Sequence, residues 1–432
     1  MKNLILLAFI FIGITVRSQN SGPDLVGYWH NWNDANAPYL QLPQIDSRYT
    51  VIEIAFATPA PGTHASMQFS PSGTTQTSFI TDLQILQSQG KKVLISIGGA
   101  TDPVSLLDTT DRNTFVSTML DILNTYNFDG IDIDLEGSSL STSGGTISNP
   151  TDPQIVLLIE AIRAIMLDYQ IHHGKRLMLT MAPETAFVQG GMSAFGGIWG
   201  AYLPVIEALK DSIEILQVQL YNSGSMFGLD GNIYTQGTAD FIVAMTEAVI
   251  RGFNTSGGTF SGIPSNHVAI GLPACPSAAG GGYVSPAVVQ SAVNYLRGTG
   301  PQAGNYTLLQ NGGYPDLRGM MTWSINWDAV STCASTDEYA INYETIFSVP
   351  TGTGTITDAS VELGPNPVNI LLYLNRENSS LNGEAFHIYN SYGELCISGM
   401  LNKKHETIDL GGLSSGIYLL QSEHFSKKLI KE

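Results

Sequence analysis

The chain has few cysteines, few basic residues and a low density of charge, and each shortage excludes a class of protein. Three cysteines among 432 residues are too few for a disulfide framework, and neither they nor the eight histidines show zinc-site spacing. Only 19 lysines and arginines face 37 acidic residues, so the net charge is −18. This charge disfavours nucleic acid and anionic membranes but not a neutral polysaccharide. The glycine clusters lack phosphate-loop spacing, and we expect no cofactor and no metal.

Long hydrophobic runs are also missing, except at the N-terminus. Residues 4–16 form an apolar run of about 13 residues after Lys2, which is short for a membrane span but typical of a signal peptide. Short side chains at Val16-Arg17-Ser18 suit cleavage. We therefore predict a signal peptide over residues 1–18 and a secreted mature chain without a membrane span that begins near Gln19. A lone transmembrane anchor is the alternative.

Short apolar runs recur between residues 24 and 328, each followed by turn residues and usually by a helical pattern. They are Leu25–Trp29, Val51–Ala57, Lys92–Ile97, Gly130–Glu136, Arg176–Ala182, Ile215–Tyr221, Val268–Leu272 and Gly319–Ile325. The helical patterns include Thr81–Gln89, Arg112–Asn127, Gln154–Gln170 and Ala287–Leu296. Eight strand–helix units predict an α/β fold, a (β/α)8 TIM barrel over residues 19–348. A doubly wound open sheet is the alternative.

The most informative stretch is residues 129–137, which read Asp-Gly-Ile-Asp-Ile-Asp-Leu-Glu-Gly. Because side chains alternate along a strand, Asp132, Asp134 and Glu136 share one face, about 6.6 Å apart along the backbone. Buried like charges raise each other's pKa and destabilise a fold. A chain keeps such a row where chemistry needs a protonated acid near neutral pH. The alternative is an exposed edge strand with chance acids.

This stretch resembles the DxxDxDxE signature of family 18 glycoside hydrolases, the chitinases and their relatives, at Asp129, Asp132, Asp134 and Glu136. The resemblance implies substrate-assisted catalysis, in which the 2-acetamido oxygen of the sugar attacks its own anomeric carbon. Glu136 would then be the proton donor, Asp134 would orient the acetamido group, and Asp132 would share a proton with Asp134. Asp129 lies off the acid face by strand parity, and we expect it to be supporting.

Other strand ends fit the same family. Ser96-Ile97-Gly98-Gly99 resembles the SxGG motif, in which small residues let the third strand pack closely beside the catalytic one; a plain turn is the alternative. Gln219 and Tyr221 share a face at the end of the sixth strand. The resemblance implies that the Tyr221 hydroxyl binds the acetamido carbonyl, with Gln219 supporting it, whereas a core tyrosine is the alternative.

Aromatic side chains predict where sugar rings bind. Trp323 ends the eighth strand, where the family has a tryptophan beneath the scissile sugar, and a core tryptophan is the alternative. Tyr28, Trp29 and Trp32 follow the first strand and could line outer subsites. Met181 and Ala182 end the fifth strand and resemble pocket-lining positions.

The expected activity is hydrolysis of chitin or N-acetylglucosamine oligosaccharides by a monomer. We expect internal cutting, because only Pro273 to Ser285 separate the seventh strand from the next helix, too few residues for the insertion of deep-tunnel members. An endo-β-N-acetylglucosaminidase that acts on N-glycan cores is the alternative. A non-catalytic chitin-binding lectin is the alternative from another class, although such lectins lose the glutamate.

The composition changes after residue 348. A Thr/Gly-rich linker over residues 349–360 precedes short β-like runs over residues 361–432, which predict a small all-β module. Its motifs include Gly364-Pro365-Asn366-Pro367, Leu413-Ser414-Ser415-Gly416-Ile417-Tyr418 and a terminal basic stretch. They resemble the C-terminal sorting domain of the type IX secretion system, which implies that machinery as a partner. A carbohydrate-binding module is the alternative.

Two cysteines follow neighbouring barrel strands. Cys275 comes after the seventh predicted strand and Cys333 after the eighth, and a signal peptide implies an oxidising compartment. We expect them to form a disulfide, with two buried thiols as the alternative.

Overall fold

The computed structural model describes residues 22–347, 361–376, 384–390, 395–403, 405–422 and 426–432. The chain divides into two compact units, residues 1–347 and 348–432. The signal peptide predicted over residues 1–18 and the linker predicted over residues 349–360 lie outside the described residues. Among the described residues, no helix combines the length and the hydrophobicity that a bilayer span requires.

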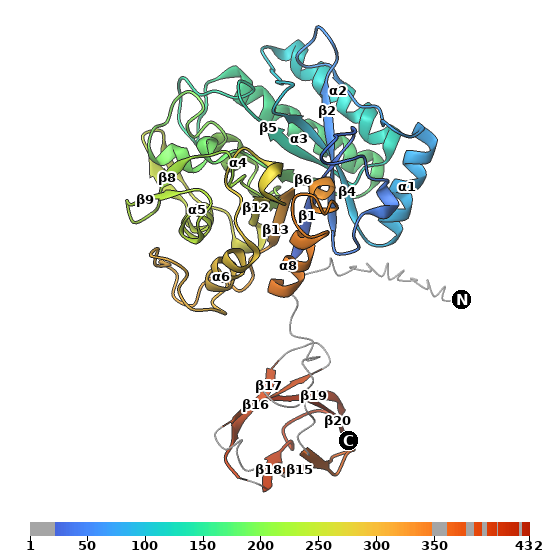
Figure 1. The fold of residues 1–432 in the computed structure, drawn as a ribbon, viewed down its shortest axis with the longest axis vertical. Helices are drawn as coiled ribbons and strands as arrows, with labels where there is room; N and C mark the ends of the chain where they lie inside the picture. Colours follow the sequence, from blue (N-terminus) through green and yellow to red (C-terminus); the bar gives the residue numbers. More distant parts are fainter. Residues whose placement is uncertain (1–21, 348–360, 377–383, 391–394, 404, 423–425) are drawn as a thin grey trace, which may run out of the picture. The chain divides into compact units, whose positions relative to one another are not determined.

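Eight parallel strands form the centre of the first unit (Figure 1). They are β1 (Asp24–His30), β2 (Val51–Pro59), β4 (Lys92–Gly99), β5 (Gly130–Leu135), β6 (Met178–Met181), β7 (Ile215–Leu216), β12 (Ala269–Pro273) and β13 (Gly319–Trp323). Their order in the sheet is β12-β13-β1-β2-β4-β5-β6-β7. Parallel bridges from Leu216 to Val268 and from Gln219 to Gly271 join the two ends. The predicted (β/α)8 barrel is therefore confirmed, and the open sheet is excluded.

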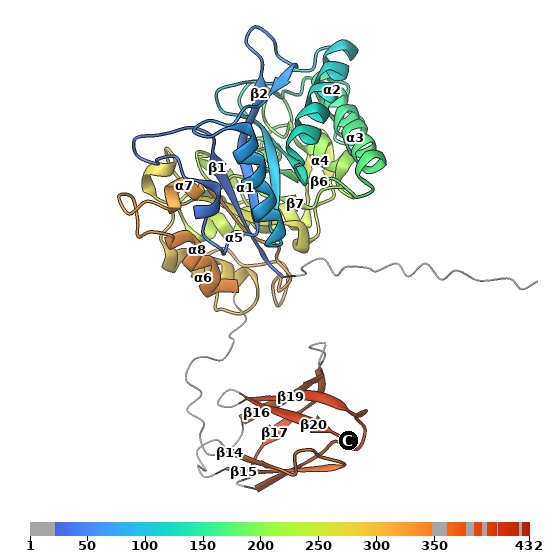
Figure 2. The ribbon, with the colours of Figure 1, turned by 90° about the vertical axis from the view of Figure 1, so that its right-hand side faces the viewer.

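Helices surround the strands, as the two views in Figures 1 and 2 show. They are α1 (Gln76–Ser88), α2 (Thr109–Tyr126), α3 (Pro153–His173), α4 (Leu203–Leu209), α5 (Ala239–Arg251), α6 (Pro286–Leu296), α7 (Ile325–Asp328) and α8 (Glu338–Phe347). Local signals set several ends: the Asp108 side chain caps α2 at its N-terminus, and Asn127 ends it with φ 55°. The connections carry β3 (Met67–Gln68), β8 (Ser225–Phe227), β9 (Ile233–Thr235), β10 (Phe253–Thr255) and β11 (Gly258–Phe260).

The strands separate two buried regions, because their side chains alternate between the barrel interior and the helices. On β5, Ile131, Ile133 and Leu135 belong to the large core beneath the helices. A smaller cluster fills the interior, with Val26, Tyr28, Val51, Ala55, Leu94, Ala182, Ile215, Ala269 and Met321. Asp132 and Asp134 have the opposite parity to the β5 isoleucines, so they face this interior.

The second unit consists of two antiparallel sheets over a shared core. One contains β14 (Val361–Gly364), β15 (Leu371–Arg376) and β18 (His405–Asp409), and the other contains β17 (Leu395–Leu401), β16 (Glu384–Asn390), β19 (Gly416–Ser422) and β20 (Ser426–Lys431). Leu372 of the first sheet and Ile388, Leu420 and Leu429 of the second are fully buried. The predicted all-β module is thus confirmed.

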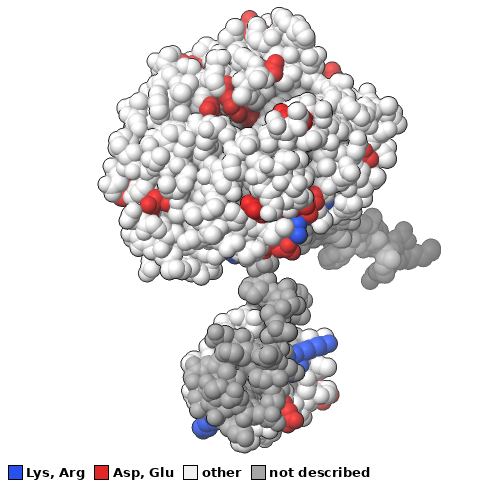
Figure 3. All heavy atoms as spheres, viewed as in Figure 1, with Lys and Arg blue, Asp and Glu red and all other residues white. Residues whose placement is uncertain are grey.

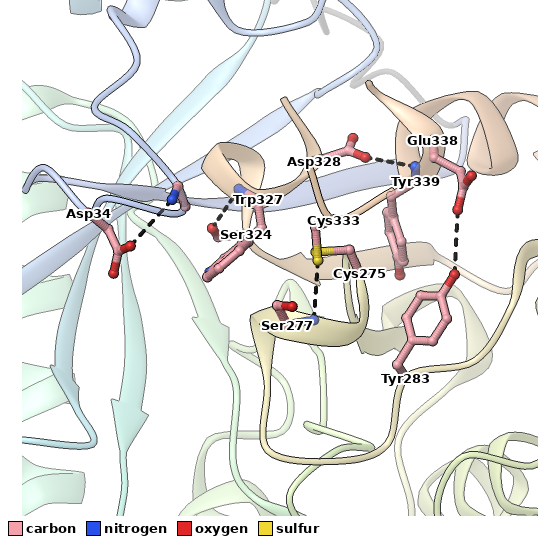
Figure 4. The surroundings of a disulfide bond; sticks show 11 residues. Asp34, Cys275, Ser277, Tyr283, Ser324, Trp327, Asp328, Cys333, Glu338 and Tyr339 are labelled. Atoms are coloured by element: carbon pink, nitrogen blue, oxygen red, sulfur yellow. Dashed lines mark hydrogen bonds between the residues drawn. A yellow bond between two sulfur atoms is a disulfide. The ribbon is translucent and has the colours of Figure 1, made fainter. Parts of the chain in front are cut away.

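The predicted disulfide is present between Cys275 and Cys333, whose Cα atoms lie 5.7 Å apart (Figure 4). Cys275 follows β12, and Cys333 lies beyond α7. The backbone N–H of Ser277 donates to Cys333 Sγ at 3.2 Å, and the Tyr283 hydroxyl donates to Glu338 Oε1 at 3.5 Å. These contacts tie the loop after β12 to the segments after β13.

Candidate active site

The three acids of the predicted row run from the barrel interior to its C-terminal end. Asp132 and Asp134 lie on β5 and are almost fully buried, whereas Glu136, directly after the strand, is partly exposed. Figure 3 shows acidic side chains gathered on the face of the barrel unit that Figure 1 presents. A ligand can therefore reach Glu136 more easily than the two aspartates.

Hydroxyl groups from neighbouring strands surround the carboxylate of Asp132. The hydroxyls of Tyr28 on β1 and Ser96 on β4 each donate to Asp132 Oδ2 at 2.7 Å. The Thr180 hydroxyl on β6 lies 2.8 Å from the other oxygen, Oδ1. Burial raises the pKa of Asp132, and these hydrogen bonds oppose the rise.

Gln219 joins the two outer acids. Its Nε2 lies 2.8 Å from Asp134 Oδ1, 3.0 Å from Glu136 Oε1 and 3.0 Å from the carbonyl oxygen of Ala182. Parallel bridges from Gln219 to Glu184 and Gly271 hold its backbone between β6 and β12. The amide therefore fixes the separation and the orientation of the carboxyl pair.

Burial raises the pKa of both outer acids. Asp134 has its pKa well above the usual range because it is buried, and the charges of Glu136 and Asp132 add to the effect. Burial also raises the pKa of Glu136; Gln219 opposes this rise, and Glu184 reinforces it. A carboxyl of this kind keeps its proton closer to neutral pH, as a general acid requires.

Tyr221 lies beside the acids after β7 and is 5% exposed. Burial raises the pKa of its phenol well above the usual value, and the charges of Asp134 and Glu136 contribute. The hydroxyl is therefore neutral and able to donate a hydrogen bond.

Aromatic rings line the barrel end next to the acid row. Trp323 at the end of β13 lies 5.6 Å from Tyr28, 4.9 Å from His30 and 5.9 Å from Phe56 between ring centroids, and it is stacked on Phe56. Trp32 is 6.2 Å from Trp323. Both tryptophans are partly exposed, so their faces can contact the apolar side of a sugar ring.

The predicted close packing of the third barrel strand is present at Gly98 and Gly99. Both have positive φ, 105° and 81°. A Cβ atom on Gly98 would lie 2.7 Å from the carbonyl oxygen of Asp134, and one on Gly99 would lie 2.8 Å from the Phe56 ring. Glycine is therefore required at Gly98 for β4 to lie against β5, and at Gly99 for β4 to lie against the Phe56 ring of β2.

Three of the residues predicted to line the site, Tyr28, Trp29 and Met181, lie elsewhere. Tyr28 is 1% exposed and donates to Asp132 in the barrel interior, so it lines no outer subsite. Trp29 faces the helices, where its ring packs against Tyr39 and its Nε1 donates to the carbonyl oxygen of Leu40, so it lines no subsite. Met181 belongs to the core beneath the helices, and its neighbour Ala182 faces the interior instead. Asp129 is off the acid face, as expected.

Asp129 lies at the opposite end of β5 from the site. Its carboxylate accepts from the backbone N–H of Val93 at 3.1 Å and from Gln87 Nε2 at 3.0 Å, and it pairs with Lys175 at 3.3 Å. Its part in the signature is therefore to align the beginnings of β4 and β5.

Sequence reasoning missed several polar residues of the site. Glu53 on β2, Thr180 and Gln217 are fully buried in the barrel interior, and His30 is buried with neither ring nitrogen hydrogen-bonded. Burial lowers the pKa of His30 to about 4, so the ring is neutral. A signal was available for Glu53, because it is a lone acid within the apolar run Val51–Ala57.

In the described part of the chain, no group of three or more His, Cys, Asp or Glu side chains has the arrangement of a metal site. The residues described above bring together carboxyls, hydroxyls, two amides and aromatic rings. These groups can transfer protons and bind an uncharged, ring-shaped ligand.

Comparisons with known proteins identify the families of both parts of the chain. Residues 24–337 match the family model of glycosyl hydrolases family 18, and residues 363–432 match that of a secretion system C-terminal sorting domain. Chitinase Chi52 of Paenibacillus xylanexedens is 48% identical, over 72% of this chain and 60% of its own length. Chitinase ChiA of Flavobacterium johnsoniae is 33% identical, over 87% of this chain and 25% of its own length.

A solved family GH18 chitinase from Chromobacterium violaceum has a TM-score of 0.66 and 33% identity, and the match covers 76% of this chain and 84% of that one. The chain spans 60% of the length of the curated relative Chi52. The family-model match covers most of the barrel unit, including every residue of the acid row. The chain therefore belongs to family 18 of the glycosyl hydrolases, and its last 70 or so residues belong to a secretion system sorting domain family.

Proposed function

We propose that this protein is a secreted chitinase that hydrolyses β-1,4-linked N-acetylglucosamine with retention of configuration. The observation that carries the proposal is the acid row, in which a partly exposed Glu136 is linked through Gln219 to a buried Asp134. Within the row, the accessible Glu136 lies beside Asp134, which is only 2% exposed. Such an arrangement suits a reaction in which the substrate supplies the nucleophile.

The steps follow from the positions of the side chains. Glu136, with its raised pKa, donates its proton to the leaving glycosidic oxygen. The acetamido oxygen forms a bond to the anomeric carbon as the glycosidic bond breaks. Asp134 accepts the acetamido N–H, and the neutral Tyr221 hydroxyl donates to the acetamido oxygen. Glu136 then removes a proton from the water that opens the cyclic intermediate.

The variant Glu136→Gln tests the proposal. We expect it to fold, to bind N-acetylglucosamine oligomers and to lose about 10²–10⁴-fold in kcat, the usual effect of losing a general acid. Glu160→Gln is the matched control, since Glu160 lies on the exposed surface of α3 and pairs with Arg112. Proton NMR of fresh product should show the β-anomer first. Normal turnover by Glu136→Gln, or inversion, would refute the mechanism.

The substrate and the cutting mode need their own assay. The chitinase relatives favour chitin over the N-glycan core, and the presence of Glu136 argues against a lectin. Only η5 (Pro276–Ala278) and short loops lie between β12 and α6, which favours an accessible site and internal cutting. Equal turnover of a high-mannose glycoprotein, or chitin dimer as the sole early product, would count against this assignment.

The C-terminal unit directs export through the type IX machinery in this proposal. The family-model match over residues 363–432 supports it. A chain that ends near residue 351 should keep full activity on soluble oligomers and accumulate in the periplasm of the native host. If that truncated chain is secreted normally but loses activity on solid chitin, residues 361–432 bind substrate instead.

A further inference from the structure

A further buried carboxyl lies behind the acid row, and the mechanism above gives it no role. Glu53 on β2 is fully buried in the barrel interior. Gln217 Nε2 donates to both of its oxygens, at 2.6 and 2.7 Å. In the part of the chain that the structure describes, no hydrogen bond or ion pair joins Glu53 to a basic side chain. A buried carboxylate without a cation is strongly destabilising, so a proton must be close to it.

The hydroxyl of Thr180 locates that proton. Thr180 Oγ1 lies 2.9 Å from Glu53 Oε1 and 2.8 Å from Asp132 Oδ1. A hydroxyl has one hydrogen to donate, so it can donate to only one of the two carboxyls. The other carboxyl must donate to it and is therefore protonated. Asp132 Oδ2 already accepts from two hydroxyls, which leaves Oδ1 as the oxygen that can exchange a proton with Thr180.

We propose that Glu53 and Asp132 share one proton through the Thr180 hydroxyl, and that Glu53 is a positioning residue which sets the charge of Asp132 during turnover. In the transfer, the O–H bond of Glu53 breaks as one forms on Thr180 Oγ1. The original O–H bond of Thr180 breaks as one forms on Asp132 Oδ1. Two protons each move by one hydrogen bond, the net transfer is one proton from Glu53 to Asp132, and no other reactant is consumed.

The transfer matters when Asp134 becomes charged beside the cationic intermediate. The charge of Asp132 raises the pKa of Asp134, so a proton on Asp132 at that moment removes one repulsive neighbour. Glu53 then holds the negative charge one side chain further from the substrate. This consequence rests on the proposed function, whereas the sharing itself rests only on the geometry.

The titratable groups around Glu53 are all acidic. Tyr28 faces it from β1, Asp132 and Asp134 from β5, and Tyr221 from the segment after β7. Burial raises the pKa of Glu53 well above its usual range, and the charge of Asp132 raises it further. Both effects favour a proton retained on Glu53.

Four variants test the proposal. In Glu53→Gln the amide oxygen can accept from Gln217 at the position of Oε2, and the amide nitrogen can donate to Thr180 at the position of Oε1. The contact of Gln217 with Oε1 is lost, and the transfer is blocked. Thr180→Val removes the hydroxyl with little change of shape, and Thr180→Ser keeps it. Glu247→Gln is the matched control, since Glu247 is a fully buried carboxylate on α5 that accepts from Tyr306 and Tyr314.

The first readout is the pH profile of kcat on an N-acetylglucosamine oligomer. In Glu53→Gln we expect the acid limb, which reports the ionisation of Asp134, to move to higher pH by about one unit, or about tenfold in kcat on that limb, with KM unchanged. The direction follows because Asp132 can no longer take up the proton, and its charge raises the pKa of Asp134. Thr180→Val should lower kcat with KM unchanged, and Thr180→Ser and Glu247→Gln should keep the wild-type profile. A wild-type profile in Glu53→Gln, or in Thr180→Val, would overturn the proposal.

The second readout needs no activity. A carboxyl whose pKa is raised on folding contributes stability that is present below the unfolded pKa of about 4.3 and is lost as pH rises through the folded pKa. The urea midpoint of Glu53→Gln should therefore fall less steeply than that of the wild type as pH rises. The difference between the two slopes should correspond to one proton bound by the folded wild-type protein. An unchanged slope would refute the sharing. If the wild-type chain cleaves no chitin oligomer while the slope changes as expected, the proposed function fails and the shared proton stands.

Discussion

Gln219 offers the sharpest test of how the acid row is tuned, because one amide nitrogen contacts both outer carboxyls. The substitution Gln219→Met keeps the length of the side chain and removes the contacts with Asp134 at 2.8 Å and Glu136 at 3.0 Å. These hydrogen bonds lower the pKa of each acid against the opposing effect of burial. Their loss should therefore raise both pKa values further.

The size of the effect follows from the strength of a hydrogen bond to a charged group, roughly 1.5–3 kcal/mol. One pKa unit corresponds to about 1.36 kcal/mol, so the alkaline limb of the pH profile should move up by roughly one to two units. The kcat value should fall at neutral pH, because Asp134 ionises less readily and the Glu136 carboxyl is no longer held in place.

The stability of the variant has a pH dependence of known sign. Raised carboxyl pKa values contribute stability below the unfolded values of about 4, and this stability is lost as pH rises through the folded values. The difference in unfolding free energy between wild type and Gln219→Met should thus be smallest at acid pH and grow towards pH 8. Urea titrations at several pH values and a pH–rate profile measure both effects.

Gln189→Met is the matched control for Gln219→Met. Gln189 is fully buried outside the acid row, and its Nε2 donates to the carbonyl oxygen of Met245 at 3.1 Å. This control should lower stability without moving the alkaline limb. If the limb stays in place, or moves down, in a folded Gln219→Met protein, the reasoning about the amide is wrong.

Three further substitutions probe the framework and the substrate platform. Gly98→Ala should lower the free energy of unfolding in urea by about 1–3 kcal/mol, because φ is positive and the new Cβ would meet the Asp134 backbone. Gly62 also has positive φ but no atom within 4 Å of a new Cβ, so Gly62→Ala measures the cost of the backbone conformation alone. The double variant Cys275→Ser/Cys333→Ser should lose about 2–4 kcal/mol relative to the oxidised protein, and addition of a reductant to the variant should change nothing. Trp323→Ala should weaken oligomer binding about threefold to tenfold by calorimetry, and Trp323→Phe should restore part of it, because stacking contributes about 0.5–1.5 kcal/mol. Unchanged affinity in Trp323→Ala would place the sugar elsewhere.

Strand existence and the acid row were predictable because the signals are local. Each barrel strand appeared as a short apolar run, and the alternation in residues 130–136 placed three acids on one face. Helix α4 gave no comparable signal, because its seven residues are too few for a helical period to repeat. Helix α5 was missed although its apolar residues Phe241, Met245 and Val249 recur at helical spacing.

The wrong placement of Trp29 and Met181 in the predicted site follows from the hydrophobicity of the barrel strands. A strand buried on both sides is apolar at every position, so hydrophobicity does not tell which face points into the barrel. Tyr28 and Ala182, which were predicted together with Trp29 and Met181, face the barrel interior, whereas Trp29 and Met181 face the helices. Register with the neighbouring strands decides this, and register is a property of the closed sheet.

The sequence alone determined which strand bears the acids and that they share a face, because that depends only on the period of an extended chain. The tertiary structure decided what each acid meets. Ser96 reaches Asp132 across 36 residues, Gln219 reaches Asp134 across 85, and Gln217 reaches Glu53 across 164. Only closure of the barrel brings such distant residues within hydrogen-bonding distance, and it does so in a buried interior where each polar group must find a partner.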